Sequence, residues 1–354
     1  MTALRDQPGA VRDEDAFDAN AVHEWLSATV DGLSGLDGPL AVRQYPGGAS
    51  NLTYLLRYPD RELILRRPPA GHKAASAHDM RREFTVQQKL KPVYQYVPEV
   101  LALCTDHAVL GSDFYVMTRI DGIILRGDLP PEITLEPDEA ALLAYRTFDR
   151  LIELHEVDPA AAGLTDLGKG AGYVERQVRG WSDRYRKART PDAPDGEAVM
   201  AWLHENQPGD VRTCVIHNDF RFDNVVLNDE LNVIGVLDWE MATLGDPLMD
   251  LAGSMAYWIQ SDDDDVAQLS RRQPSHLPGM PKRRELVDYY CDRMGLSARN
   301  WVFYEVFGWF RLAVIMQQIY YRFHSGQTNN QAFAAFPRFV EYLDARCRRA
   351  IGAP

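Results

Sequence analysis

The sequence is poor in cysteine, has no long apolar run and carries no excess of positive charge. Its four cysteines, at positions 104, 214, 291 and 347, are widely spaced and form no Cys-x-x-Cys pair. A disulfide framework or a cysteine zinc site is therefore not expected, and the thiols are predicted to be reduced and mostly buried. No apolar run approaches the roughly 18 residues of a membrane-spanning helix, and no signal peptide is recognised. These absences predict a cytoplasmic protein without a membrane partner.

Composition and charge narrow the class further. The chain has 354 residues and a net charge of −13, and 45% of its residues are hydrophobic. That apolar share is enough to fill a core, and the length suggests two domains or two lobes. Because an acidic protein does not attract the phosphate backbone of nucleic acids, no nucleic-acid partner is expected.

The most informative stretch is residues 213–240, which read TCVIHNDFRFDNVVLNDELNVIGVLDWE. Three short apolar runs, typical of buried strands, alternate here with polar residues. The first run leads to Asp219, the second follows Asn224, and the third ends at Asp238 after a predicted hairpin turn at 228–230. Two carboxylates and an amide are thereby placed at the ends of neighbouring strands, which are rigid mounts for chemistry.

These three side chains suit phosphoryl transfer from ATP. Mg²⁺ takes oxygen ligands and keeps several waters, so Asn224 and Asp238 can hold such ions without an all-protein cage. Asp219 can accept a proton from the attacking hydroxyl group, or simply orient it. Protein kinases divide the work in the same way, with an Asp, an Asn five residues later and a metal-binding Asp after a hairpin. Either acid alone would more simply cap a turn, but the combination favours the catalytic interpretation.

The motifs also carry a resemblance to a known family. The strings HNDFRFDN at 217–224, LDWE at 237–240 and GDPLMD at 245–250 resemble the aminoglycoside phosphotransferase and choline kinase group of small-molecule kinases. They are similar as well to the kinase-like domain associated with acyl-CoA dehydrogenases. The resemblance implies an α+β, bilobal protein-kinase-like fold, with a small antiparallel-sheet N-lobe over 15–121 and a mainly helical C-lobe over 122–354.

The predicted N-lobe follows residues 1–14, which are polar and expected to be mobile. It contains a glycine-rich turn between two predicted strands, 40–45 and 52–58. Such a turn lets backbone N–H groups approach a phosphate, although most Gly-Gly turns are plain hairpins. The resemblance implies that this turn covers the nucleotide. The candidate nucleotide-binding residues here are Gly47, Gly48, Ser50 and Asn51.

The next predicted strand, 63–67, departs from the kinase pattern because it carries no lysine. Arg66 takes the position of the lysine that touches the ATP phosphates in kinases. Arginine can hold a phosphate through its bidentate fork, with a different reach. Glu83, on a helix predicted over 78–90, is the expected ion-pair partner of Arg66. An alternative assigns the functional contact to Arg67.

Residues 114–122 link the two predicted lobes. The segment resembles the hinge of the family, whose backbone meets adenine. Thr118 and Ile120 are the candidate contacts that this resemblance implies.

Four polar residues around the catalytic motif are candidates for support or for contact with the substrate. Asp250 resembles the kinase-fold aspartate that accepts hydrogen bonds from the backbone of the catalytic loop, and His217 is a second support residue. Asp246 is predicted to cap the following helix. Arg221 could contact the substrate or the transferred phosphoryl group, or pair with a nearby acid.

Three C-lobe segments bear on the substrate. A helix predicted over 173–189 is rich in arginine and lysine, which fits either a solvated face or attraction of an anionic group such as the phosphates of CoA. A helix over 299–325 is rich in aromatic residues. Most of these are expected in the core, while others, with Arg311 and Arg322, could line an apolar substrate cleft. Residues 261–282, which begin with an acid run, are predicted to be a mobile insertion with solvated charge.

The predicted function is ATP- and Mg²⁺-dependent transfer of the γ-phosphate to a hydroxyl of a small molecule, for which the resemblance suggests a hydroxyacyl-CoA. An aminoglycoside-type or choline-type acceptor is an alternative. So is a catalytically silent nucleotide-binding or regulatory module, which the missing lysine favours and the intact Asp219, Asn224 and Asp238 set disfavours. A protein kinase is disfavoured because the sequence has no HRD, DFG or APE string.

Overall fold

The computed structural model describes residues 4–46, 51–69 and 79–353. The chain divides into two compact units. The first comprises Met1–Ile124, Ala162–Leu164 and Asn224–Met241, and the second comprises Leu125–Ala161, Thr165–Asp223 and Ala242–Pro354. The motif stretch, residues 213–240, is therefore divided between the units. Asn224 and Asp238 belong to the first unit, and Asp219 belongs to the second.

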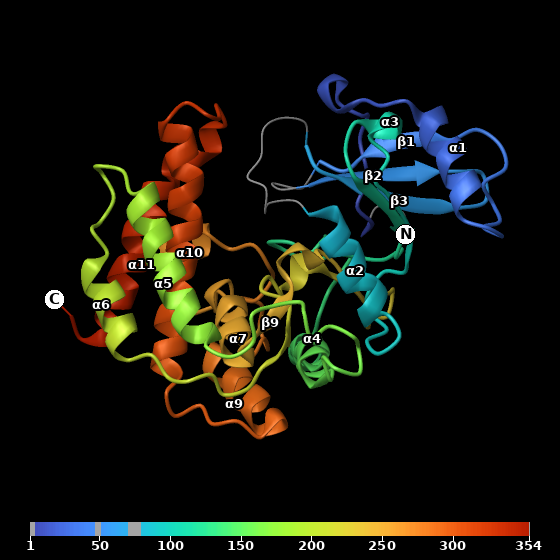
Figure 1. The fold of residues 1–354 in the computed structure, drawn as a ribbon. Coiled ribbons are helices and arrows are strands. Elements are labelled where there is room, and N and C mark those ends of the chain that lie inside the picture. The colour runs from blue at the N-terminus through green and yellow to red at the C-terminus, as the bar shows by residue number, and fades with distance from the viewer. Residues whose placement is uncertain (1–3, 47–50, 70–78, 354) are drawn as a thin grey trace. The chain divides into compact units, whose positions relative to one another are not determined.

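The first unit is built on a five-stranded antiparallel sheet with the strand order β1-β2-β3-β5-β4, part of which is labelled in Figure 1. Its strands are β1 (Ala41–Gln44), β2 (Leu52–Arg57), β3 (Glu62–Arg67), β4 (Val100–Cys104) and β5 (Phe114–Thr118). Its helical elements are the 3₁₀ turn η2 (Asp13–Asp15) and the helices α1 (Ala19–Thr29), α2 (Met80–Leu90) and α3 (His107–Leu110).

Both faces of this sheet are covered by packed side chains. Successive strand residues point to opposite sides, so neighbouring residues contact different helices. Tyr54 in β2 packs with Val22 and Leu26 of α1 on one face. The next residue, Leu55, packs with Met80 of α2 on the other face. The apolar contacts thus hold α2 against the sheet and fix the helix and strand that carry the predicted ion pair.

The described part of residues 1–14 is packed rather than mobile, which corrects the prediction. Gly9 forms an antiparallel bridge with Gln44 at the edge strand β1. The guanidinium of Arg5 lies 2.8 Å from the carboxylate of Asp121. The exposed backbone of an edge strand offers hydrogen-bond partners to any neighbouring segment. The polar composition of this segment gave no sign of those partners.

A hairpin of β7 (Val225–Leu227) and β8 (Val233–Val236) also belongs to the first unit and was predicted from the sequence. Asn228 closes its turn, since its side-chain oxygen accepts hydrogen bonds from the backbone N–H groups of Glu230 and Asn232. This is the local bonding that makes asparagine a frequent turn residue. The 3₁₀ turn η4 (Trp239–Met241) follows the hairpin.

The second unit is mainly helical. Its helices are α4 (Pro137–Glu156), α5 (Tyr173–Ala188), α6 (Glu197–Glu205), α7 (Pro247–Ala256), α8 (Asp265–Leu269), α9 (Arg283–Met294), α10 (Trp301–His324) and α11 (Phe336–Ile351). Two short antiparallel strands, β6 (Cys214–Ile216) and β9 (Thr243–Gly245), and the 3₁₀ turns η3 (Phe222–Asn224) and η5 (Gln331–Ala335) complete the described elements. A small antiparallel sheet in one unit and mainly helices in the other confirm the predicted α+β class.

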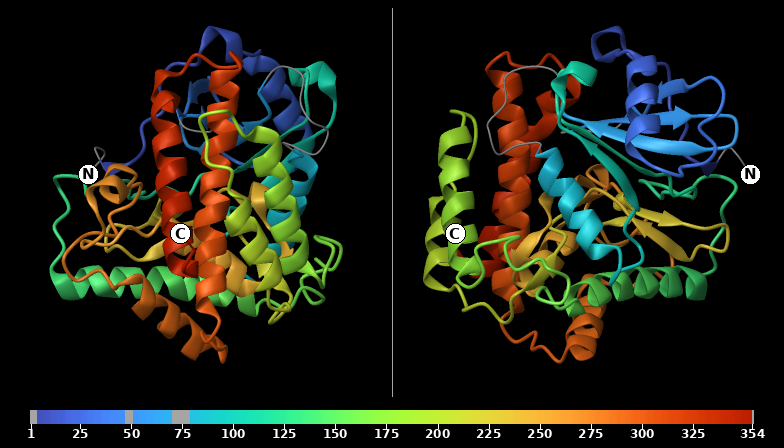
Figure 2. Two further views of the ribbon diagram at one scale, coloured as in Figure 1. Left: turned by 90° about the vertical axis from the view of Figure 1, so that its left-hand side faces the viewer. Right: turned by 45° about the vertical axis from the view of Figure 1, so that its right-hand side comes forward.

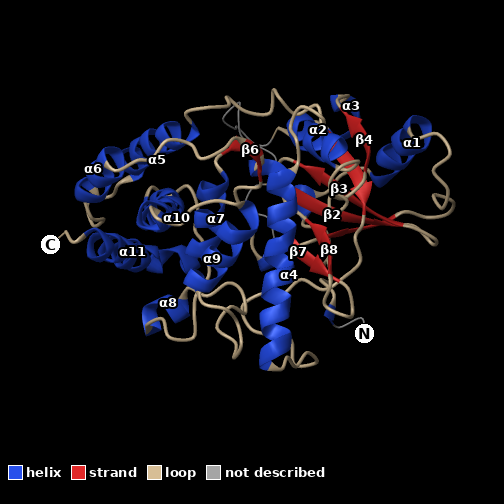
Figure 3. Cartoon of the chain, turned by 90° about the horizontal axis from the view of Figure 1, so that it is seen from below, coloured by secondary structure: helices blue, strands red, loops and turns tan. Residues whose placement is uncertain are grey.

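Helix α10 forms the centre of the second unit. It packs against α5, α7 and α11, and Figure 3 shows it among these helices. The left view of Figure 2 shows α10 and α11 running side by side. Gly308 allows the close approach of α7, because a Cβ atom at this position would lie 2.5 Å from the carbonyl oxygen of Ala252. Most aromatic residues of α10 are buried, as predicted.

The four cysteines are all buried and free, which agrees with the prediction from their spacing. Burial raises the pKa of Cys291 to about 11, so this thiol stays protonated near neutral pH. Among the helices that the structure describes, none has the length and apolar character needed to cross a membrane.

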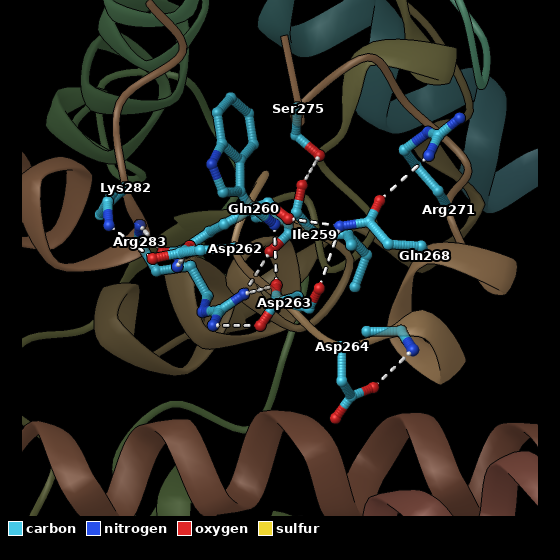
Figure 4. Close-up of polar contacts among 12 residues, drawn as sticks. Ile259, Gln260, Asp262, Asp263, Asp264, Gln268, Arg271, Ser275, Lys282 and Arg283 are labelled. Atoms are coloured by element: carbon cyan, nitrogen blue, oxygen red, sulfur yellow. Dashed lines mark hydrogen bonds and ion pairs between the residues drawn. The ribbon is translucent and has the colours of Figure 1, made fainter. Parts of the chain in front are cut away.

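Residues 261–282 were predicted to be a mobile insertion with solvated charge; the charge is solvated at Asp262, Asp264 and Asp265, which are exposed, but the segment contains helix α8 and is anchored at Asp263. The side chain of Asp263 is 9% exposed and lies 2.5 Å from Nη1 of Arg283. A second guanidinium, that of Arg346, lies 3.5 Å away. Figure 4 shows Asp263 pointing toward Arg283, while Asp262 lies beside Lys282. The sequence indicated the acid run but not the basic side chains that pack against it.

This difference between neighbouring acids predicts different effects on stability. Burial raises the pKa of Asp263, but the hydrogen bond and charge of Arg283 outweigh it and lower the pKa. Asp263→Asn leaves Arg283 short of its carboxylate, and we expect a loss of about 3 kcal/mol in the free energy of unfolding at pH 7. The lowered pKa means that folding favours the ionised carboxylate of Asp263. This stabilisation is fully present above the unfolded pKa of about 4, so the loss caused by the substitution should shrink as the pH falls below that value.

Asp262→Asn is the matched control. The Asp262–Lys282 pair is exposed on both sides, and exposed pairs contribute on the order of 0–1 kcal/mol. Denaturant unfolding of the full chain at pH 7 and at lower pH measures both variants. Equal destabilisation by the two substitutions would contradict the assignment of Asp263 as a buried anchor.

Candidate active site

In the first unit, the candidate site is organised by Arg66 in β3, whose side chain is 10% exposed. Its Nη1 lies 3.1 Å from the carboxylate of Glu83 on α2, so the predicted ion pair is present. Its Nη2 lies 3.0 Å from the carboxylate of Asp238 and 3.9 Å from that of Glu240. The bidentate fork of arginine serves several acids at once, which a lysine ammonium does in a different geometry.

Glu83 is buried in a polar network as well as paired with Arg66. The hydroxyl of Tyr115 donates a hydrogen bond of 2.8 Å to its carboxylate. The side-chain amide of Asn51 lies 3.4 Å from the same carboxylate and donates to Glu240 at 3.0 Å. Burial raises the pKa of Glu83, although the charge of Arg66 opposes the rise. The network therefore depends on the guanidinium to keep a buried carboxylate compensated.

Asn224 and Asp238 lie at the open end of the β7–β8 hairpin, as the sequence predicted. The backbone oxygen of Asn224 accepts a hydrogen bond of 2.8 Å from the N–H of Leu237. One candidate metal ligand, Asn224, is thus part of this bonded pair, and the other, Asp238, directly follows it. The side chain of Asp238 is 32% exposed. Its φ of 66° is in the left-handed region, which is uncommon for a non-glycine residue and occurs often at functional sites.

The donor set at these two positions fits Mg²⁺. A carboxylate and an amide oxygen are the hard ligands that this ion takes, and it commonly binds through one or two carboxylates plus substrate phosphates. Within the described residues, no group of three or more His, Cys, Asp or Glu side chains is arranged to hold a metal. Asp238 is shared with Arg66, so the guanidinium would lie beside an ion bound at this carboxylate.

Of the other candidate nucleotide-binding residues, Gly47, Gly48 and Ser50 lie outside the described residues. Thr118 ends β5, and its hydroxyl accepts a hydrogen bond from the backbone N–H of Glu99. The side chain of Ile120 packs against Gly235 of the hairpin, where an added Cβ would approach it to 2.7 Å.

In the second unit, the loop that carries Asp219 is held by Asp250. The two carboxylate oxygens of Asp250 accept the backbone N–H groups of His217 and Asn218, each at 2.7 Å. His155 on α4 lies 3.0 Å from Asp250, and its side chain is fully buried. Burial raises the pKa of Asp250, but the hydrogen bond and charge of His155 outweigh it and lower the pKa.

Asp219 follows Asn218 in the loop, and its side chain is partly exposed. Its carboxylate lies 3.2 Å from Arg221, which also lies 2.7 Å from Asp223. The guanidinium of Arg221 sits 4.7 Å from the centre of the Tyr257 ring. Of the two predicted roles for Arg221, the structure forms the ion pair. Burial raises the pKa of Asp223, and the charge of Arg221 opposes that rise.

Two side chains, Glu240 and Arg311, have roles that sequence reasoning missed or assigned elsewhere. Glu240 stands in the recognised LDWE string but received no role, and it lies within the network around Arg66. Arg311 was expected to line a substrate cleft. It is instead buried, and its Nη2 donates a hydrogen bond of 2.6 Å to the backbone oxygen of Asn218. The predicted cap is present, since Asp246 accepts the N–H groups of Leu248 and Met249.

The five-stranded antiparallel sheet of the first unit and the helices of the second define the protein-kinase-like fold class. The chain belongs to the phosphotransferase enzyme family, whose model matches residues 41–286. Among curated proteins, it is 37% identical to acyl-CoA dehydrogenase family member 10 of Mus musculus over 90% of this chain and 30% of that protein. It is 32% identical to acyl-CoA dehydrogenase family member 11 of Homo sapiens over 95% of this chain and 44% of that protein.

The chain thus spans less than half the length of these curated relatives. A solved protein of Ralstonia eutropha, provisionally assigned as an aminoglycoside phosphotransferase, is 29% identical with a TM-score of 0.79, over 96% of this chain and all of that one. Choline kinase from Cryptosporidium parvum is 10% identical, with a TM-score of 0.63 and coverage of 95% and 96% of the two chains. The latter likeness shows the fold, and together the comparisons confirm the resemblance and fold class expected from the motifs.

The network around Arg66 predicts a large effect of removing the guanidinium. Arg66→Met leaves the buried Glu83 without its counter-ion, and we expect a loss of about 3–5 kcal/mol in the free energy of unfolding. Arg66→Lys restores one charge without the fork and should lie between wild type and Arg66→Met. Thermal and denaturant unfolding of the full chain measures the losses.

Arg57→Met serves as the control. Arg57 pairs with Glu62, and its side chain is 50% exposed, so its removal should cost about 1 kcal/mol or less. If Arg66→Met were no more damaging than Arg57→Met, the buried network would not depend on Arg66.

Proposed function

We propose that this chain transfers the γ-phosphate of ATP, with Mg²⁺, to a hydroxyl group of a small molecule, and that the acceptor is a hydroxyacyl-CoA. The observation that carries the proposal is the loop of Asp219. Its backbone is fixed by Asp250 while its carboxylate stays partly exposed beside Arg221. A fixed, accessible carboxylate can orient a hydroxyl for attack, which is the main contribution a protein makes to phosphoryl transfer.

The residues of each unit have distinct tasks in this proposal. Asp219 orients the acceptor hydroxyl and takes up its proton as the oxygen bonds to the γ-phosphorus and ADP leaves. Asn224 and Asp238 hold Mg²⁺, which neutralises charge on the phosphates. Arg66 supplies a further positive charge next to Asp238. Nucleotide use is supported by family membership and by a solved aminoglycoside phosphotransferase of the same fold, 14% identical with a TM-score of 0.59, that was crystallised with AMP-PNP and hygromycin B.

The choice of acceptor is supported by the relatives and by surface charge. The curated relatives described above are named as members of the acyl-CoA dehydrogenase family. Their names favour an acyl-CoA as the substrate class of the related region in this chain. Helix α5 also presents exposed basic side chains, among them Arg179 and Lys187. In a protein with a net charge of −13, such a local basic face attracts anionic groups, and CoA carries several phosphates.

The role of Asp219 is tested by Asp219→Asn. Loss of the carboxylate should lower turnover at least about 100-fold, as is usual when a positioned acid–base group is removed. The increase in melting temperature on adding Mg-ATP should persist, because nucleotide binding is assigned to other residues. Asp229→Asn, an exposed acid in the hairpin turn, is the control and should keep wild-type turnover. Wild-type turnover by Asp219→Asn would overturn the assignment.

The acceptor is tested by measuring ADP release with Mg-ATP and a panel of hydroxyacyl-CoAs, sugars, aminoglycosides and amino alcohols. Release with the hydroxyacyl-CoAs alone is the expected result. Preference for an aminoglycoside or a choline-type alcohol would refute the proposed acceptor. Stabilisation by ATP without ADP release from any acceptor would instead indicate the silent nucleotide-binding module.

A further inference from the structure

Asn218, the residue before Asp219, adopts a conformation that needs external support. Its φ is 67°, in the left-handed region that non-glycine residues seldom occupy. Such residues persist only where surrounding contacts over-determine them, and they cluster at functional sites. The contacts that hold Asn218 therefore decide where the carboxylate of Asp219 is presented.

Three polar atoms of Asn218 have partners on three different helices. Its N–H donates to Asp250 of α7 at 2.7 Å. Its side-chain oxygen accepts a hydrogen bond of 3.1 Å from the hydroxyl of Tyr173, the first residue of α5. Its backbone oxygen accepts one of 2.6 Å from Arg311 of α10. Three helices thus converge on one residue of the loop.

The peptide group that joins Asn218 to Asp219 is held at both of its polar atoms. Arg311 binds its oxygen, and its N–H, which belongs to Asp219, donates to Nδ1 of His217 at 3.2 Å. A peptide group is planar, so fixing both atoms fixes the plane from which the side chain of Asp219 departs. Free rotation of this plane would move the carboxylate away from an acceptor hydroxyl.

Arg311 is a buried arginine whose position is not explained by an ion pair. It is buried, and in the part of the chain that the structure describes no carboxylate lies within ion-pair distance of it. Its guanidinium lies 5.4 Å from the centre of the Trp181 ring, and a Cβ added at Gly253 would come within 2.7 Å of its Nη1. A buried charge without an acid is costly, so its bond to the loop carbonyl is the interaction that explains its presence.

We propose that Arg311 and Tyr173 are positioning residues for the phosphoryl-transfer reaction: they hold the Asn218–Asp219 peptide and so orient the carboxylate of Asp219. This inference rests on the proposed function for its catalytic consequence. The mechanical part, a loop held by α5 and α10, can be measured without turnover.

The test uses the full chain and three variants. Arg311→Met removes a charged hydrogen bond and should lower kcat about 10- to 100-fold, and Arg311→Lys, which keeps a donor, should recover part of it. Tyr173→Phe removes one neutral bond and should lower kcat roughly 3- to 10-fold. The KM for ATP should change less than twofold in all three, since ATP binding is assigned to the first unit.

A fourth variant guards against misfolding. Gly253→Ala introduces only a methyl group on α7 and favours the helix, but it displaces the guanidinium of Arg311. It should lower kcat with no loss of melting temperature. Arg346→Met is the control. This arginine also lies over an aromatic ring, 4.3 Å from the centre of Trp309, but the partners that the structure describes for it, such as Asp263, are not residues of the Asp219 loop. It should lower the melting temperature and leave kcat unchanged.

Hydrogen exchange separates failure of this inference from failure of the proposed function. In a peptide covering residues 214–222, Arg311→Met and Tyr173→Phe should speed exchange of the loop amides at least about fivefold, whether or not an acceptor is known. Unchanged exchange in both variants would overturn the inference. So would a wild-type kcat in both, measured on an active protein. An inactive wild type whose loop exchange still responds would overturn the proposed function alone.

Discussion

The carboxylate of Asp250 is the interaction on which the candidate catalytic loop depends. It accepts two backbone N–H groups of the loop, from His217 and Asn218, and it is itself held by His155. A buried carboxylate is stable only when its oxygens are compensated, and here the compensation comes from the groups it positions. The same bonds therefore satisfy the buried acid and set the course of the chain toward Asp219.

In the first unit a buried positive charge, that of Arg66, holds the candidate site residues in place. Arg66 is buried and is compensated by Glu83 and Asp238, which come from a helix and from the end of a hairpin. An arginine in the position of the usual lysine thus has a structural role, because its fork joins the elements that carry the candidate ligands. This gives the departure from the kinase pattern a structural reason that is compatible with phosphoryl transfer.

Much of this could be predicted where the chemistry is local in sequence. The β7–β8 hairpin, the cap by Asp246 and the pairing of Arg66 with Glu83 follow from strand patterning, capping preference and the position of one acid on a helix. The errors occurred at segments 1–14 and 261–282, whose polar composition suggested mobility. Both are held by partners that their own composition does not reveal.

The amino-acid sequence by itself determined where the candidate catalytic and metal-binding residues lie, since the motif strings place Asp219, Asn224 and Asp238 at strand ends through local patterning alone. Only the tertiary structure decided what holds them. The contact of Arg311 with Asn218 spans 93 positions and that of Arg66 with Asp238 spans 172. Such contacts depend on how helices and strands pack, and packing brings together side chains that no periodicity or spacing connects.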